Sequence, residues 1–169
     1  MSFEDVREIT DLIVDYAACL DEGCVDQVAE MFADARMTIR FEGRVVVDVL
    51  GAEAVRDLLS RSHAMHDGLP STHHVTTNIR VQIDGDQAIA RSYVTLMQAA
   101  PGFPLQVVSC GVYRDRFRRS ATGWRFSERI SEARLVGDLS RRLAADALPS
   151  LSTPADRSNH TSPKEKNDG

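Results

Sequence analysis

The chain has little of what marks nucleic-acid-binding, secreted or membrane-spanning proteins. Its 169 residues carry a net charge of −5 and only three cysteines. Nucleic acid or an anionic membrane would require a basic patch, whereas the arginines are scattered along the predicted strands. Cys19, Cys24 and Cys110 cannot all pair, and no long apolar run precedes the first helix. We therefore expect a cytoplasmic protein with free thiols that binds neither nucleic acid nor a membrane.

Cofactor signatures are also missing. The sequence has no phosphate loop and no dinucleotide fingerprint, which disfavours hydride transfer. The histidines at positions 63, 66, 73 and 74 lack the carboxylates that would complete a metal site with them. We expect no cofactor and no metal.

Residues 2–23 have the pattern of one amphipathic helix. Apolar side chains recur at spacings of three or four, Ser2 with Asp5 forms a plausible N-terminal cap, and Gly23 suits the end of the helix. Tyr16 falls within the apolar stripe and Asp21 in the last turn. The negative end of the helix dipole and partial burial would raise the pKa of Asp21, which makes it a candidate acid/base. The alternative is a solvated surface aspartate and a core tyrosine.

The remainder of the chain predicts an α+β domain. Two further helices and a hairpin are followed by four long strands joined by turns, which form a cone-shaped curved antiparallel sheet packed on three helices, an α+β barrel. The strands are expected at 72–83, 87–99, 105–118 and 124–135. This domain covers residues 1–136, with a short C-terminal helix within 137–148 and a disordered tail at 149–169. Because three helices cannot cover both faces of such a sheet, we expect a homodimer or homotrimer.

A pair of histidines opens the first long strand, in the run from Ser71 to Asn78. Adjacent strand residues point to opposite faces, so His74 shares a face with Thr76 and Asn78, and His73 does not. A histidine here is commonly structural. Paired with Asp21, His74 becomes a candidate catalytic base.

These elements together resemble the SnoaL-like family of the nuclear-transport-factor-2-like superfamily. The resemblance covers residues 3 to 135. It rests on Tyr16 and Asp21 in the first helix, the His-His-Val-Thr-Thr-Asn strand opening, an Ile-Asp-Gly-Asp-Gln-Ala hairpin, and a Gly-Val-Tyr-Arg-Asp-Arg strand followed by Gly-Trp-Arg-Phe. The nearest functional analogues are scytalone dehydratase, bile acid dehydratase and the dehydrochlorinase that acts on lindane.

The resemblance implies a set of site residues. Asp21 and His74 correspond to the dehydratase Asp-His dyad, and Tyr16 to a tyrosine of the bile acid dehydratase. Arg129 corresponds to an arginine of the dehydrochlorinase, although simple alternation from Trp124 and Phe126 turns it to the opposite face unless a bulge intervenes. Substrate-binding roles are expected for Arg129, Asn78 and Tyr113.

The leading hypothesis is a cofactor-independent lyase (a dehydratase) or isomerase that acts on a hydrophobic cyclic compound such as a steroid or polyketide. The alternatives are a noncatalytic small-molecule-binding or accessory subunit, and a polyketide cyclase with the same acid/base requirements.

Overall fold

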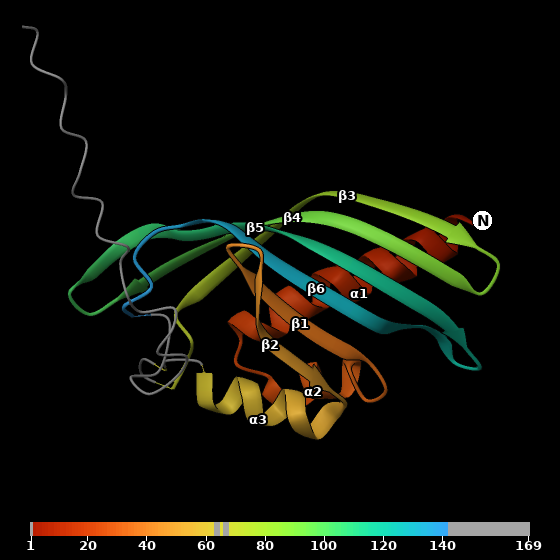
Figure 1. Ribbon diagram of the computed structural model, residues 1–169, viewed down its shortest axis with the longest axis horizontal. Coiled ribbons are helices and arrows are strands. Elements are labelled where there is room, and N and C mark those ends of the chain that lie inside the picture. The colour runs from red at the N-terminus through yellow and green to blue at the C-terminus, as the bar shows by residue number, and fades with distance from the viewer. Residues whose placement is uncertain (1, 63–64, 66–67, 142–169) are drawn as a thin grey trace, which may run out of the picture.

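The computed structural model describes residues 2–62, 65 and 68–141, which form three helices and one six-stranded sheet (Figure 1). In chain order the elements are α1 (Phe3–Asp21), α2 (Val25–Met31), β1 (Arg36–Phe41), β2 (Arg44–Leu50), α3 (Ala52–Ser62), β3 (Thr72–Asp84), β4 (Gln87–Ala100), β5 (Phe103–Ser120) and β6 (Gly123–Val136). Most of the predicted C-terminal helix, the tail, His63 and His66 lie outside the described residues.

Helix α1 begins and ends where its sequence predicts. Asp5 donates its backbone N–H to the Ser2 hydroxyl at 3.1 Å, and Ser2 donates its own N–H to the Asp5 carboxylate at 3.2 Å. This reciprocal cap satisfies donors that the first helical turn leaves unpaired. Beyond the last turn, Gly23 has a φ of 72°, which glycine adopts without steric cost. The position of Asp21 in the last turn is therefore set by local sequence.

The sheet is curved and mixed. Its strand order is β2-β1-β6-β5-β4-β3, so the two edge strands are β2 and β3 and the sheet is open, not a closed barrel. The four long strands pair antiparallel, as predicted. The β1–β2 hairpin extends the same sheet, because β1 pairs parallel with β6 from Arg36 opposite Glu128 to Phe41 opposite Ala133. The sequence reasoning did not foresee this parallel pairing.

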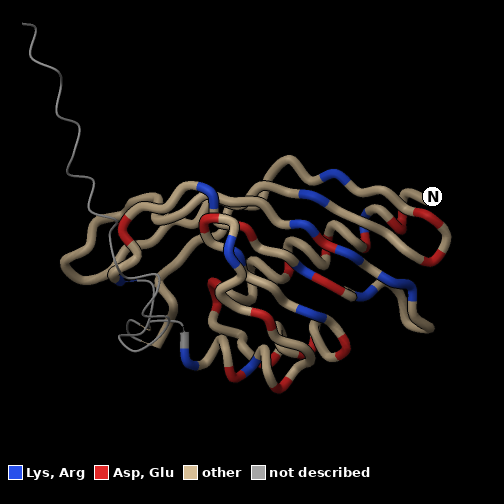
Figure 2. Tube along the Cα trace, in the orientation of Figure 1, with Lys and Arg blue, Asp and Glu red and all other residues tan. Residues whose placement is uncertain are grey.

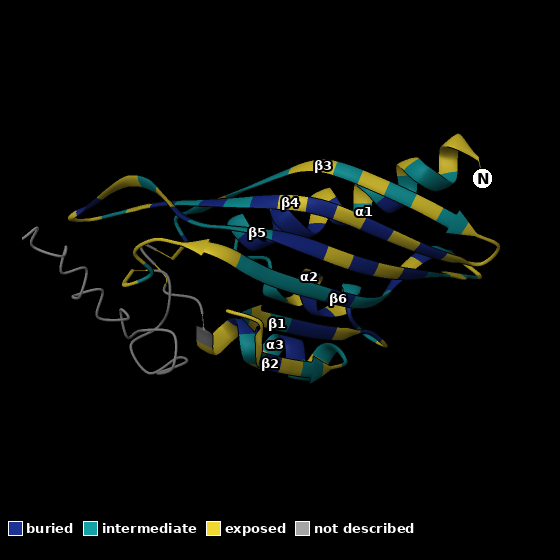
Figure 3. Cartoon of the chain, turned by 45° about the horizontal axis from the view of Figure 1, so that its top comes forward, coloured by how far each residue is buried: buried dark blue, intermediate teal, exposed yellow. Residues whose placement is uncertain are grey.

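Helix α1 runs along one face of the sheet, called the inner face here, and contacts β3 and β6 (Figure 1). Helices α2 and α3 pack together, and α3 contacts β2. Buried and exposed residues alternate along β4 and in the middle of β5 (Figure 3). The apolar stripe of α1 and the inner residues of the strands form the main core, in which the Phe32 and Phe126 rings stack with centroids 5.0 Å apart.

Two irregularities change which residues face the core. In β6, Arg116 lies opposite Glu128 but Phe117 lies opposite Phe126, so Ser127 is an extra residue. In β3, one extra residue falls between Thr77 and Arg80, and Asn78 there has a φ of 55°. One inserted residue reverses the alternation of side chains beyond it.

The outer face brings together arginines that are distant in sequence. Arg80 lies directly opposite Arg91, which lies opposite Arg114, so the three form a row across β3, β4 and β5 (Figure 2). Glu132 forms an ion pair with Arg114, and Glu128 pairs with Arg116 at 3.1 Å. The fold thus gathers positive charge that looks dispersed in the sequence and partly neutralises it.

Candidate active site

Asp21 and His74 are in direct contact at the end of α1. The His74 Nδ1 lies 2.6 Å from the Asp21 Oδ1, and the two side chains are only 5% and 16% exposed. The His74 backbone N–H donates to the other carboxylate oxygen at 2.7 Å, and the Thr72 hydroxyl donates to Oδ1 at 2.9 Å. Because β3 is an edge strand, part of its backbone is available for a helix side chain.

The electrostatics of Asp21 differ from the sequence-based expectation. Burial acts to raise the pKa of Asp21. The hydrogen bonds from the His74 ring and backbone, the positive charge of His74 and the Thr72 hydroxyl outweigh burial and lower that pKa below its ordinary value. The prediction of a raised pKa was wrong because it considered the helix dipole and burial but not the three donors. Asp21 remains a carboxylate that fixes His74, and a neutral His74 carries its proton on Nδ1.

The neighbouring histidine is placed differently. The His73 side chain is 68% exposed, and its Nδ1 lies 3.8 Å from the Asp21 Oδ2. Thr72 and His74, two residues apart, both reach Asp21 from one face of β3. The alternation of strand side chains therefore distinguishes the two histidines as expected.

A second polar group is enclosed by aromatic rings in the core. The Arg129 side chain is fully buried and binds Asp115 through two hydrogen bonds, from Nε at 2.8 Å and Nη2 at 2.7 Å. Its guanidinium carbon lies 4.0 Å from the centroid of the Tyr16 ring and 4.2 Å from that of Tyr113. Burial acts to lower the pKa of Arg129, but Asp115 outweighs it and raises that pKa, so the guanidinium stays charged.

The extra residue Ser127 explains how Arg129 reaches the core. Without it, Arg129 would face away from Trp124 and Phe126, yet all three side chains are buried. Tyr16, Tyr113 and Arg129 are therefore brought together as a cluster. The sequence did not lead us to predict Asp115 as the counterion of Arg129, although Asp115 shares a face with Tyr113 by simple alternation.

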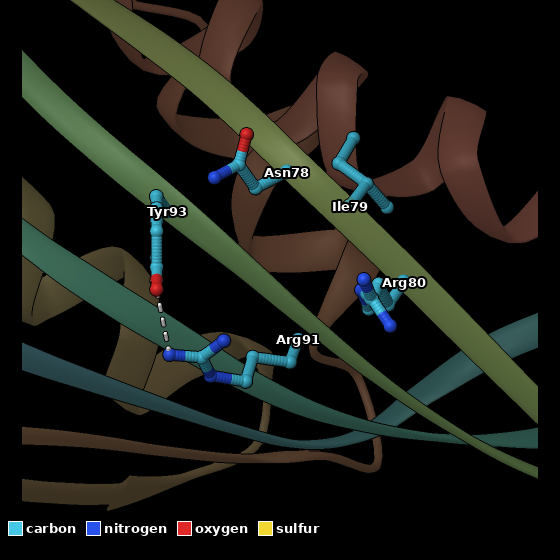
Figure 4. A pocket seen from close by; sticks show the side chains of 5 residues that line it. All are labelled: Asn78, Ile79, Arg80, Arg91 and Tyr93. Atoms are coloured by element: carbon cyan, nitrogen blue, oxygen red, sulfur yellow. Dashed lines mark hydrogen bonds between the residues drawn. The ribbon is translucent and has the colours of Figure 1, made fainter.

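Asn78 is not part of this inner site. Beyond Thr76, the extra residue in β3 turns Ile79, Val81 and Ile83 toward the core, and leaves Asn78 exposed. Asn78 lines an open hollow of about 570 Å³ with Ile79, Arg80, Arg91 and Tyr93 (Figure 4). The prediction that Asn78 shares the face of His74 was wrong because strand alternation does not continue through a bulge.

An apolar hollow of about 150 Å³ lies beside the end of α1, between the three helices. Its lining includes Cys19, Leu20, Gly23, Val25, Leu59 and Pro70. Neither Asp21 nor His74 is among its lining residues, although Leu20 directly precedes Asp21 in α1. Across the described ranges, no three His, Cys, Asp or Glu residues are grouped so as to hold a metal ion. In the same part of the chain, no helix has the length and hydropathy needed to cross a membrane.

Solved structures share this architecture. A candidate scytalone dehydratase of Novosphingobium aromaticivorans has a TM-score of 0.65 at 21% identity, covering 82% of this chain and 90% of that one. A hexachlorocyclohexane dehydrochlorinase of Novosphingobium barchaimii has a TM-score of 0.62 at 20% identity, over 83% and 90% of the two chains. A candidate aromatic-ring-hydroxylating dioxygenase beta subunit of N. aromaticivorans has a TM-score of 0.65 at 18% identity, over 78% and 90%. These identities show the fold alone.

Helices on one face of a curved, open sheet define the fold class of this chain, which is shared with solved proteins described as NTF2-like or as having a cystatin-like fold. The family model for the SnoaL-like domain matches residues 1–130, and the chain belongs to this family. An uncharacterized protein of Mycobacterium tuberculosis is 30% identical over 128 residues, which are 75% of this chain and 83% of the relative.

Proposed function

We propose that this chain is a cofactor-independent acid/base enzyme, a dehydratase-like lyase or an isomerase, that acts on a hydrophobic cyclic small molecule such as a steroid or polyketide. The observation that carries the proposal is the 2.6 Å contact between the largely buried side chains of Asp21 and His74. A carboxylate that accepts the Nδ1 proton holds the imidazole in one tautomer and stabilises its protonated form. Nε2 then carries the lone pair that accepts a proton.

The reaction follows from these roles. His74 Nε2 takes a proton from a carbon next to a carbonyl, and the electron pair of that C–H bond forms the new double bond as the β-hydroxyl leaves. Tyr16 donates a proton to the departing oxygen, which leaves as water. The Arg129 guanidinium stabilises negative charge on the carbonyl oxygen, in surroundings that exclude water. Tyr113 holds the guanidinium by ring contact at 4.2 Å.

The test compares wild type with His74→Ala and Asp21→Asn on a panel of cyclic β-hydroxy ketones and β-hydroxy thioesters. Loss of the base is expected to lower turnover by about 10²–10⁴-fold. His73→Ala is the matched control, because His73 is adjacent in sequence but exposed. Turnover that is unchanged in both His74→Ala and Asp21→Asn would refute the proposal.

A noncatalytic binding or accessory subunit is the second candidate, and the fold shared with a candidate dioxygenase beta subunit favours it. In that case the Asp21–His74 contact only joins α1 to β3. Ligand-induced thermal stabilisation that survives in His74→Ala, without turnover in wild type, would support this candidate. A polyketide cyclase would need the same proton transfer and would be recognised by cyclised products.

We also propose a homodimer or homotrimer in the cytoplasm. Large apolar side chains stay exposed near the end of the sheet where β5 begins and β6 ends, namely Leu105, Val107, Leu135 and Val136. Neighbouring exposed apolar residues favour association. Cys19, Cys24 and Cys110 are free thiols, which suits a reducing compartment. Sedimentation that shows only monomer at micromolar concentration would contradict the oligomer.

A further inference from the structure

Buried polar atoms without a protein partner lie on the inner face of the sheet. Among the described residues, Thr76 Oγ1, Ser92 Oγ and Arg129 Nη1 have no hydrogen-bond partner. Ser92 and Arg129 are 0% exposed. A fourth such atom, Gln98 Oε1, belongs to the other end of β4. Because leaving a buried polar atom unpaired costs free energy, each of these atoms requires an explanation.

The sheet register places three of them along one diagonal of the inner face, a diagonal row that shifts by two residues from each of these atoms to the next. Thr76 lies opposite Val94, and Ser92 follows two residues away on the same face of β4. Ser92 lies directly opposite Tyr113, whose ring contacts the Arg129 guanidinium. The row therefore crosses the sheet from β3 to β6. It begins two residues beyond His74, on the face that His74 shares with Thr76.

The hydrogen-bonding groups along this diagonal row favour a ligand that carries oxygen atoms. Hydroxyls can donate or accept, but a guanidinium only donates, so both ends of the row can bind acceptor oxygens. The two hydrogen bonds to Asp115 fix the orientation of the Arg129 guanidinium, so the direction of its Nη1 is set before any ligand binds. A hydrocarbon ring would leave all three atoms unpaired.

We propose that the Thr76 and Ser92 hydroxyls form an oxygen-binding subsite beside His74, and that Arg129 Nη1 binds a second oxygen of the same ligand. This inference rests on the proposed function and narrows it, because the substrate is then a cyclic compound with at least two oxygen functions, such as a hydroxy ketone. Thr76 and Ser92 determine specificity. They hold the substrate but take no part in proton transfer.

The test measures binding to the full-length chain by calorimetry, without turnover. The ligands are tetralin, 1-tetralone and 4-hydroxy-1-tetralone, which share one bicyclic skeleton and carry no, one and two oxygens. Affinity should rise along the series, by roughly tenfold for each oxygen that finds a donor. Ser92→Ala and Thr76→Val should each lower the affinity for 4-hydroxy-1-tetralone by about tenfold and leave that for tetralin unchanged.

Thr77→Val is the matched control, because Thr77 is adjacent to Thr76 but exposed, and it should leave all three affinities unchanged. An ordered water is the other source of an acceptor oxygen. If a water fills this place, Ser92→Ala should lower the melting temperature of the free protein and leave the affinities for the three ligands unchanged. That result would overturn the proposal. An affinity series without preference for oxygen in wild type would also overturn it. If the proposed enzymatic function is wrong and the subsite is right, the wild type shows no turnover but still binds the oxygen-bearing ligands more tightly than tetralin.

Discussion

Asp115 and Asp21 each bind a basic side chain, but they do so in different surroundings. Asp115 is fully enclosed and binds a permanently charged guanidinium through two hydrogen bonds. Asp21 is partly exposed and binds an imidazole, a group that exists in a neutral and a protonated form. The first pair cannot change its charge without a large loss of stability, so it is a rigid part of the core. The proposed function requires the second pair to gain and lose a proton.

The largest effect is expected on breaking the enclosed pair. Asp115→Asn leaves the Arg129 charge without a counterion in the core, which should cost about 3–5 kcal/mol of unfolding free energy. Denaturant unfolding measures it. A loss below about 1 kcal/mol would mean that this pair is no more critical than a surface pair.

Asp21→Asn should affect chemistry more than stability. An amide cannot stabilise the protonated imidazole, so turnover of a hydroxy ketone should fall by roughly 10²-fold. Steady-state kinetics, with His73→Ala as the control, measures this effect. A fall confined to KM would show that Asp21 only positions the ligand.

The lowered pKa of Asp21 predicts an acid-dependent loss of stability. The contribution of Asp21 should be complete above pH 3.8, the ordinary value, because the unfolded chain binds the proton more readily than the folded one. It should be lost as the pH falls through the lower folded-state value. Thermal melts of wild type and Asp21→Asn over this range measure the difference, and parallel profiles would contradict the assignment.

Thr72→Val removes one of the donors to Asp21. It should cost about 1 kcal/mol of unfolding free energy and bring the pKa of Asp21 closer to its ordinary value. NMR titration of the carboxyl carbon measures the pKa. A pKa that does not rise would show that the His74 bonds alone determine it.

The smallest effect is expected at an outer-face pair. Glu128→Gln breaks the ion pair with Arg116, whose side chain is 66% exposed. Solvent screens this pair, so the change should stay within about 1 kcal/mol. Denaturant unfolding of Glu128→Gln and Asp115→Asn under the same conditions measures both changes in unfolding free energy. Equal losses in the two variants would contradict the distinction between enclosed and surface carboxylates.

Most elements and the candidate pair could be predicted because their signals are local. The cap at Ser2, the apolar spacing of α1 and the turns between the long strands each involve residues a few positions apart. Local patterns also placed Asp21 at the end of α1 and His74 near the start of β3. The contact between them was suggested by the family resemblance, and the structure shows it at 2.6 Å.

What the sequence by itself determined is therefore the set of helices and strands and the residue types available for chemistry. Only the tertiary structure decided that Arg129 faces inward, that Asn78 faces outward and that β1 pairs parallel with β6. The physical reason is that one extra residue in a strand reverses every side chain beyond it, and a bulge is defined by its partner strand. The pKa of Asp21 was likewise decided by three donors from β3, more than fifty residues away.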